Sequence, residues 1–243
     1  ALPHAWALEY ESSTKAIELL QAALALDPNY PLALALAGWC YAQQAVYNWI
    51  DDVDTARGMA LQHAERAAES GGDDPLVLAV LGTVHSFVRN QGTARLLLER
   101  AVTLDPNAAW AWSRLGWVDV YTDHPERALE RFERAMRLSP LDPMNFNNVA
   151  GSGCAYEIMD RFDEAVDCYR RALEEKPHAT WILRVLVSAL VGAGRMDEAR
   201  SALEQLLRAY PGYTISRFCR AHVFSTPTLA RFAERFTKIG LPE

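Results

Sequence analysis

One phrase recurs along this chain, and its recurrence restricts the fold more than any other feature. Each copy has a small residue, a large apolar residue four positions later, an alanine or leucine three after that, and in most copies a proline five positions further on. The clearest copy is Ala128, Phe132, Ala135 and Pro140. Offsets of four and seven place residues on one face of an α-helix, and proline cannot continue the helix. The pattern predicts a series of helices, each buried along one stripe and each ended at the same register.

The copies follow one another at a nearly constant interval. The prolines that end them are Pro28, Pro106, Pro140, Pro177 and Pro211. The last four are 34, 37 and 34 residues apart, whereas 78 residues separate the first two, which is two periods of 34 plus ten. A copy that ends in Gly72 instead of proline fills this interval. The chain therefore holds six copies, and an internal repeat of this length is typical of helical arrays.

A second signature lies upstream of the repeated phrase. Glycine stands at one register in four of the preceding segments, at Gly38, Gly82, Gly116 and Gly153. Glycine inside a helix costs about 1 kcal/mol relative to alanine. Its recurrence at one register needs a packing reason, and we predict close contact with the helix that follows.

A pair of helices with W/L…L-G…Y followed by A…F…A…P resembles the tetratricopeptide repeat. The copy from Trp112 to Pro140 is nearly complete. The resemblance implies an all-α fold, a right-handed α-solenoid with about a dozen helices. We expect the solenoid to cover 1–213 and capping helices to cover 214–243. The expected repeats are about 1–30, 31–74, 75–108, 109–142, 146–179 and 180–213.

Three segments depart from the regular repeat. The first repeat is cut short, and we expect the chain to begin inside a larger protein. The second repeat has ten extra residues, which predict two lengthened helices joined by a tight turn with an N-cap at Asp51–Asp54. Near the end, Thr226 and Pro227 predict the start of a last helix, with Thr226 as its cap. That helix is expected to run to about Lys238 and to stop at Gly240.

Two segments resemble a narrower set of proteins. They are LSPLDPMNF, which ends at Phe146, and the C-terminal run from RVLVSALVG at Arg184 through YPGYTISRF to the terminal FAERFTKIGLPE, which ends in Gly240 to Glu243. Both are similar to the C-terminal repeat region of bacterial signalling proteins that carry a class III adenylate/guanylate cyclase or a winged-helix regulator in the N-terminal half. The resemblance implies a cytoplasmic regulatory region and an upstream effector domain, which is itself a candidate partner.

Composition restricts the function further. The net charge is −7 with no basic block, which argues against binding of nucleic acid. No run reaches the ~18 apolar residues of a transmembrane helix, so no membrane partner is expected. Four cysteines lie far apart without a metal-ligand spacing, as suits a reducing compartment. We find no catalytic constellation, metal site or cofactor motif, and expect a chain that is not an enzyme.

In the tetratricopeptide class, partners usually bind the concave face formed by the first helix of each repeat. Applied by register, this resemblance predicts a groove that is aromatic and mostly uncharged, which suits an apolar or amphipathic segment. The lysines and asparagines of a carboxylate clamp are missing at these registers. Arg184 lies opposite Glu157 in the neighbouring repeat, either as a structural ion pair or as part of a ligand site. The candidate partner-binding residues are Trp39, Phe87, Trp110, Ser113, Trp117, Tyr121, Asn147, Glu157, Trp181 and Arg184.

Other functions remain open at this point. A small-ligand sensor would have an enclosed pocket near Trp39, Tyr47 and Trp49. A dimerisation scaffold would bury its aromatic residues between two chains, as a homodimer. Trp110 and Trp117 could equally pack within the chain, against the next repeat or against the capping helix.

Overall fold

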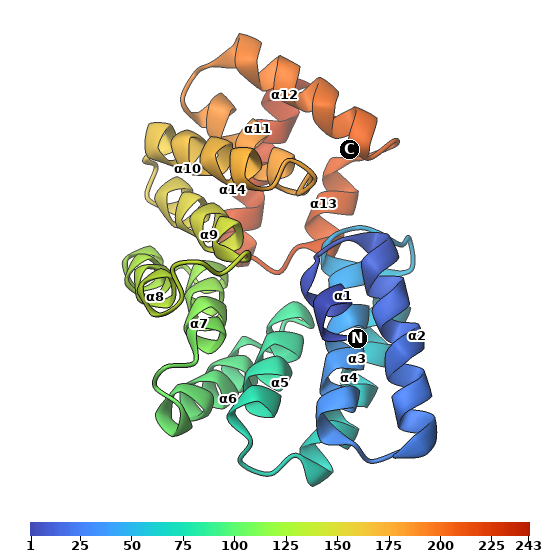
Figure 1. Ribbon diagram of the computed structural model, residues 1–243. Coiled ribbons are helices and arrows are strands. Elements are labelled where there is room, and N and C mark those ends of the chain that lie inside the picture. Colours follow the sequence, from blue (N-terminus) through green and yellow to red (C-terminus); the bar gives the residue numbers. More distant parts are fainter. The chain divides into compact units, whose positions relative to one another are not determined.

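The computed structural model describes all 243 residues, and every regular element in it is an α-helix (Figure 1). The fold is therefore all-α, as the repeat predicts. The chain forms two compact units, Ala1–Val118 and Asp119–Glu243. None of its helices is both long and apolar enough to cross a membrane.

The first unit consists of helices that pack mainly on their neighbours in sequence. They are α1 (Leu2–Trp6), α2 (Tyr10–Leu26), α3 (Pro31–Val46), α4 (Val53–Ser70), α5 (Pro75–Phe87), α6 (Gln91–Leu104) and most of α7 (Ala109–Tyr121). Within this unit α3 packs on α2, α4 and α5, and α5 packs on α6. Residues of α5, α6 and α7 share one apolar core around Leu98 and Leu115.

The second unit begins at the end of α7, and its helices also pack mainly on their neighbours in sequence. Its helices are α8 (Pro125–Leu138), α9 (Asn145–Ile158), α10 (Phe162–Glu175), α11 (Ile182–Gly192), α12 (Met196–Ala209), α13 (Ile215–Ala221) and α14 (Thr226–Ile239). Here α9 packs on α8 and α10, and α11 packs on α10, α12 and α14.

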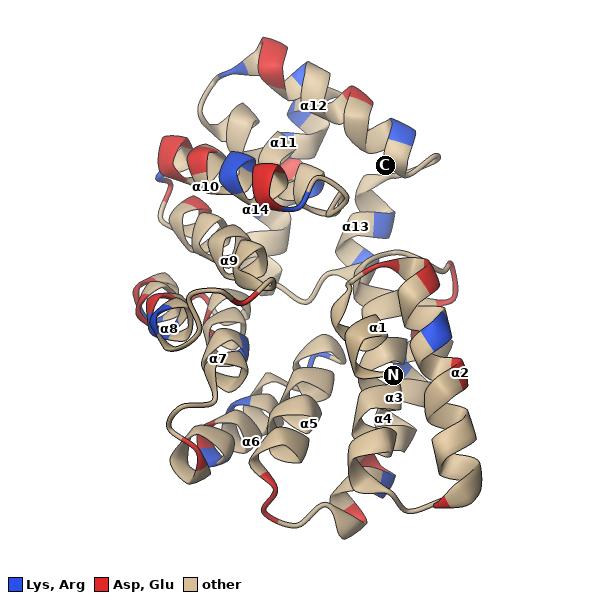
Figure 2. Ribbon diagram, viewed as in Figure 1, with Lys and Arg blue, Asp and Glu red and all other residues tan.

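In most pairs the charged residues are concentrated on the second helix (Figure 2). The first helices α3 and α5 contain no Asp, Glu, Lys or Arg, and α9 and α11 contain one each, Glu157 and Arg184. The second helices α8, α10 and α12 carry charges along one side. The first helices are therefore buried on most sides, whereas the second helices keep a solvated face.

The glycine register marks the points where two helices approach most closely. A Cβ on Gly38 would lie 2.9 Å from the carbonyl oxygen of Ala60 in α4, and a Cβ on Gly82 would lie 3.0 Å from that of Ala94 in α6. A Cβ on Gly153 would lie 2.5 Å from the ring of Tyr169 in α10. The predicted contact with the following helix is confirmed at these three positions.

The lengthened second repeat has the two longer helices that were expected, but residues 47–52 connect them in place of a tight turn. The helix α3 has 16 residues and α4 has 18, against 13 and 14 in α5 and α6. Asp52 caps α4, because its carboxylate accepts the backbone N–H of Thr55 at 3.0 Å. The extra residues therefore extend both helices, and the remainder form the connection between them.

The start of the last helix differs by one residue from the prediction. Ser225, not Thr226, is the N-cap of α14, because its hydroxyl accepts the backbone N–H of Thr228 at 3.1 Å. Thr226 lies inside the first turn, beside Pro227. At the other end the helix stops at Gly240, whose φ of 86° is left-handed, as a glycine C-cap allows.

The glycine contacts lead to a stability prediction. Gly38→Ala should lower the free energy of unfolding by about 1–3 kcal/mol, because the new methyl group would force α3 away from the backbone of α4. The matched control is Gly58→Ala in α4, where no atom lies within 4 Å of the new Cβ. That change should raise the free energy of unfolding by up to about 1 kcal/mol. Urea unfolding followed by circular dichroism measures both; equal effects of the two substitutions would contradict the packing argument.

Candidate functional site

The first unit gathers three tryptophans from three different helices. The ring centroid of Trp39 in α3 lies 4.9 Å from that of Trp6 in α1 and 5.3 Å from that of Trp110 in α7. Trp6 and Trp110 are 5.4 Å apart. Trp39 is 1% exposed, whereas Trp6 and Trp110 are half-buried. Through this cluster, α1 at the start of the chain packs on the tryptophans of α3 and α7.

Other predicted residues extend this aromatic surface. Phe87 of α5 is buried and its ring lies 6.3 Å from that of Tyr47. The guanidinium of Arg114 lies 5.1 Å from the ring centroid of Phe87 and 5.9 Å from that of Trp117. Ser113, on the same helix, is buried. A cation over aromatic rings is stabilised by the ring quadrupole.

The short helix α1 covers part of this face. The side-chain amide of Gln43 donates to the carbonyl oxygen of Ala5 at 3.1 Å, and Ala5 is fully buried. Two polar atoms remain without a hydrogen-bond partner beneath it, the indole nitrogen of Trp39 and the amide oxygen of Gln43. Because a buried polar atom without a partner costs free energy, the contact of α1 with this face is not an ideal one. The Trp39 nitrogen and the Gln43 oxygen could each still form a hydrogen bond.

In the second unit the predicted face is polar and centres on Glu157 of α9. This carboxylate is 2% exposed. It accepts hydrogen bonds from Tyr169 of α10 at 2.9 Å and Ser188 of α11 at 2.6 Å, and it forms an ion pair with Arg235 of α14 at 2.9 Å. Burial raises the pKa of Glu157 to about 7, although Arg235 and the two hydroxyls act in the opposite direction. Four helices thus meet at one buried carboxyl group.

Arg184 contacts Trp181, Tyr210 and His222, whereas Glu157 is bound by Tyr169, Ser188 and Arg235. The Arg184 guanidinium is fully buried at the other end of the face, where its Nε donates to the carbonyl oxygen of Trp181 at 3.1 Å. It lies 5.2 Å from the ring centroid of Tyr210 and 3.5 Å, Nη1 to Nε2, from His222. The cation that pairs with Glu157 is Arg235 of α14. This helix lies outside the predicted repeats, so the repeat register could not identify it.

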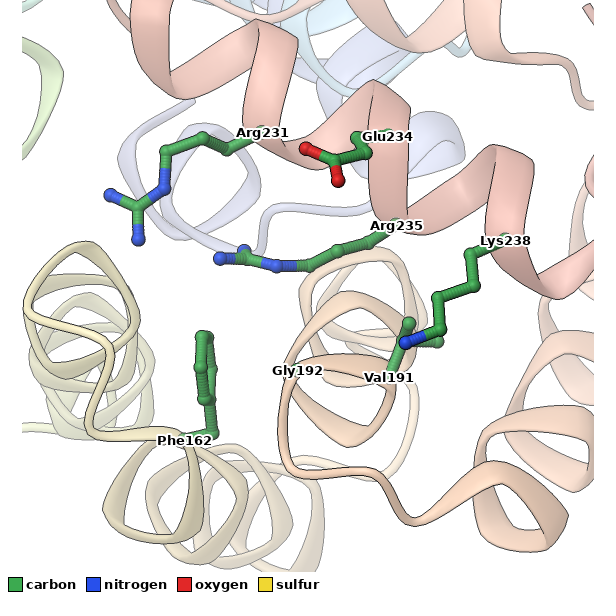
Figure 3. Close-up of a pocket in the computed structure, with 7 residues that line it drawn as sticks. All are labelled: Phe162, Val191, Gly192, Arg231, Glu234, Arg235 and Lys238. Carbon is green, nitrogen blue, oxygen red and sulfur yellow. The ribbon is translucent and has the colours of Figure 1, made fainter.

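The helix α14 places a second arginine beside the first. Arg231 donates from Nη1 to the carbonyl oxygen of Ile158 at 3.0 Å and also forms an ion pair with Asp160. Arg235 extends over the ring of Phe162, 4.7 Å from its centroid. A cleft of about 270 Å³ lies along this edge of α14 (Figure 3). Its lining residues are Phe162, Val191, Gly192, Arg231, Glu234, Arg235 and Lys238.

Nine of the ten predicted partner-binding residues are buried in this structure. Only Trp110 is half-exposed. The buried ones are Trp39, Phe87, Ser113, Trp117, Tyr121, Asn147, Glu157, Trp181 and Arg184. Their role in binding stays a prediction. The sequence analysis missed Trp6, Asp160, Arg231 and Arg235, although the repeated Arg-Phe pair in RFAERF was a visible signal for the last two.

The two buried cysteines, Cys40 in α3 and Cys154 in α9, are poor nucleophiles. Cys154 is buried with its Sγ 3.4 Å from the hydroxyl oxygen of Tyr169, and burial raises the pKa of its thiol. Burial also raises the pKa of Cys40, to about 12. Since the thiolate is the reactive form, both side chains act as apolar core groups.

The comparisons with known proteins agree with this architecture. Residues 158–215 match the family model of the tetratricopeptide repeat. No protein of curated function matches the chain. Among solved structures, the Cut9–Hcn1 hetero-tetramer of the APC/C is similar with a TM-score of 0.66 and 17% identity, over 86% of this chain. The match spans 39% of the Cut9–Hcn1 chain, so this chain corresponds to less than half of it.

Two bacterial structures are similar over most of both chains. A thermophilic TPR protein of Thermus thermophilus has a TM-score of 0.58 and 19% identity, over 83% of this chain and 100% of that one. PilF of Pseudomonas aeruginosa has a TM-score of 0.54 and 20% identity, over 86% and 88%. At these identities the likeness shows the fold alone, which is that of a tetratricopeptide-repeat protein.

The buried carboxyl group leads to a prediction about pH. Because the pKa of Glu157 in the folded chain is about 7, above its ordinary value of 4.5, the folded state binds this proton more tightly than the unfolded state. The free energy of unfolding should therefore rise as pH falls through this window, by at most about 1.4 kcal/mol per pH unit. The Glu157→Gln variant should lack this component. Urea unfolding between about pH 5 and pH 8 tests it; parallel curves for the two proteins would contradict the assignment.

Proposed function

We propose that this tetratricopeptide-repeat protein is a non-enzymatic interaction module. It binds a segment of a partner protein on the face formed by the first helices of its repeats. Proteins with this repeat generally mediate protein–protein interactions. The observation that carries the proposal is the aromatic face of the first unit, where Trp39 and Trp110 meet across two first helices.

The chemistry of that face suits an apolar or amphipathic segment. Tryptophan and arginine are the residues that most often anchor interfaces, and here Arg114 lies over the ring of Phe87 beside the tryptophans. Trp110 is the half-exposed member and gives the face an accessible edge. The unsatisfied indole nitrogen of Trp39 offers a donor to a backbone carbonyl once Trp6 moves aside.

We further propose that the module regulates a bacterial, cytoplasmic signalling protein whose effector domain is a class III nucleotide cyclase or a winged-helix regulator. The support is the resemblance of LSPLDPMNF and GLPE to that set of proteins. Both segments form defined structures here: the side chain of Asn145 donates to the carbonyl oxygen of Ser139 at 2.9 Å, and Ile215 donates to that of Pro242 at 2.8 Å. The upstream reading frame in the source genome tests this assignment, and any other domain there would overturn it.

The interaction proposal predicts a selective loss of binding. In affinity capture from a lysate of the source organism, the Trp110→Ala variant should lose partner proteins that the unchanged chain retains, because it removes the accessible aromatic anchor. The matched control is Trp112→Ala on the same helix, a half-buried tryptophan whose indole N–H instead donates to the carbonyl oxygen of Pro106 at 3.0 Å. Quantitative mass spectrometry compares the three baits. Equal capture by all of them would contradict a binding role for this face.

A further inference from the structure

The last helix occupies the polar face of the second unit much as a bound ligand would. On one side of α14, Phe232 and Phe236 are buried, with ring centroids 5.2 and 4.9 Å from that of Phe218 in α13. On the adjacent side, Arg231 and Arg235 reach toward the end of α9 and the start of α10 (Figure 3). The helix therefore presents the same pair twice, an arginine followed by a phenylalanine, at positions four apart.

The acceptors of the two arginines form one negative site. The carbonyl oxygen of Ile158 belongs to the last turn of α9, where carbonyl groups have no partner within the helix and carry the negative end of its dipole. Glu157 and Asp160 add two carboxylates beside it, and Ser188 lies 3.3 Å from Arg235. Two guanidinium groups spaced by one helical turn match this site in both charge and spacing.

The contact of α14 with this face is incomplete along one edge. The cleft of about 270 Å³ separates part of the helix from Phe162 and Gly192. Lys238, at this edge, makes no hydrogen bond or ion pair, and the ion pair of Arg231 with Asp160 is partly exposed. Partly exposed ion pairs are weak in water, so the docking depends mainly on the Glu157–Arg235 pair and on the two phenylalanine rings.

We propose that the face made by α9 and α11 is a docking surface for an amphipathic helix of a partner protein. That helix carries two basic residues four positions apart, each followed by an aromatic residue. The chain's own α14 is the resident occupant, and the partner helix replaces it. This inference rests on the proposed interaction function and specifies the partner's chemistry for the second unit.

The test uses the full chain and a labelled synthetic peptide with the sequence of residues 225–243. Arg231→Ala combined with Arg235→Ala in the chain weakens the resident helix but keeps its acceptors. Because apparent affinity scales with the fraction of chains whose face is open, this variant should bind the peptide at least about tenfold more tightly than the unchanged chain. Fluorescence anisotropy measures the affinities. Thr237→Ala, at an exposed position of the same helix outside the cleft lining, is the control and should bind like the unchanged chain.

Two further variants show whether the acceptor site itself recognises the peptide. Adding Glu157→Gln and Asp160→Asn to the arginine double variant should reduce peptide binding at least about tenfold, since each removes one anionic acceptor. A peptide in which both arginines are alanine should bind the double variant as weakly. Arg231→Ala alone, which keeps the Glu157–Arg235 pair, serves if circular dichroism shows that the double variant is unfolded; it should show a smaller gain in affinity.

Several outcomes would overturn the proposal. No gain in peptide affinity in folded arginine variants would show that α14 does not compete for this face. Unchanged binding after loss of both carboxylates would show that another surface takes the peptide. Dimerisation of the unchanged chain that the Arg231→Ala variant abolishes, seen by sedimentation, would assign the face to a second copy. None of these results bears on Trp110 in the first unit, so the two proposals fail independently.

Discussion

The close approach of paired helices at the glycine register determines most of this structure. At Gly38 a methyl group would lie 2.9 Å from a backbone oxygen, and at Gly153 it would lie 2.5 Å from an aromatic ring. A backbone atom cannot move aside at low cost, so the absent side chain fixes the distance between the helices. The first helices then lie between their neighbours, and the second helices carry nearly all the charge. Burial and the distribution of charge thus depend on the small residues at the register of Gly38, Gly82 and Gly153.

This arrangement makes any charge on a first helix a special case. Glu157 and Arg184 are the charged residues of α9 and α11, and both are buried. A buried charge is tolerated only where partners compensate its loss of hydration. For Glu157 those partners come from three other helices, including Arg235 of α14. Helix α14 therefore supplies the positive charge that pairs with Glu157, and it also packs on α11 and α12.

The sequence predicted the features that depend on local rules. The repeat predicted an all-helical chain, and an N-cap was predictable within Asp51–Asp54, where Asp52 acts, because a capping side chain acts within one turn. The partner of Glu157 was not predictable in this way. Arg235 lies 78 residues away and, within its own segment, looks like an ordinary solvated charge. Trp6 was missed for a related reason, because only the fold brings it to Trp39 and Trp110.

The two units use different forces to hold their terminal helices, and this difference determines what could replace each helix. In the first unit α1 has five residues, too few to be stable as an isolated helix, and it is held by the rings around Trp6 and one hydrogen bond from Gln43. A replacement there must offer aromatic or apolar surface, and salt should matter little. In the second unit, α14 is held by arginine–carboxylate contacts together with its phenylalanines. A replacement there must be basic, and its binding should weaken as ionic strength rises. Under the two binding proposals, one repeat architecture thus provides two faces with separate selectivity.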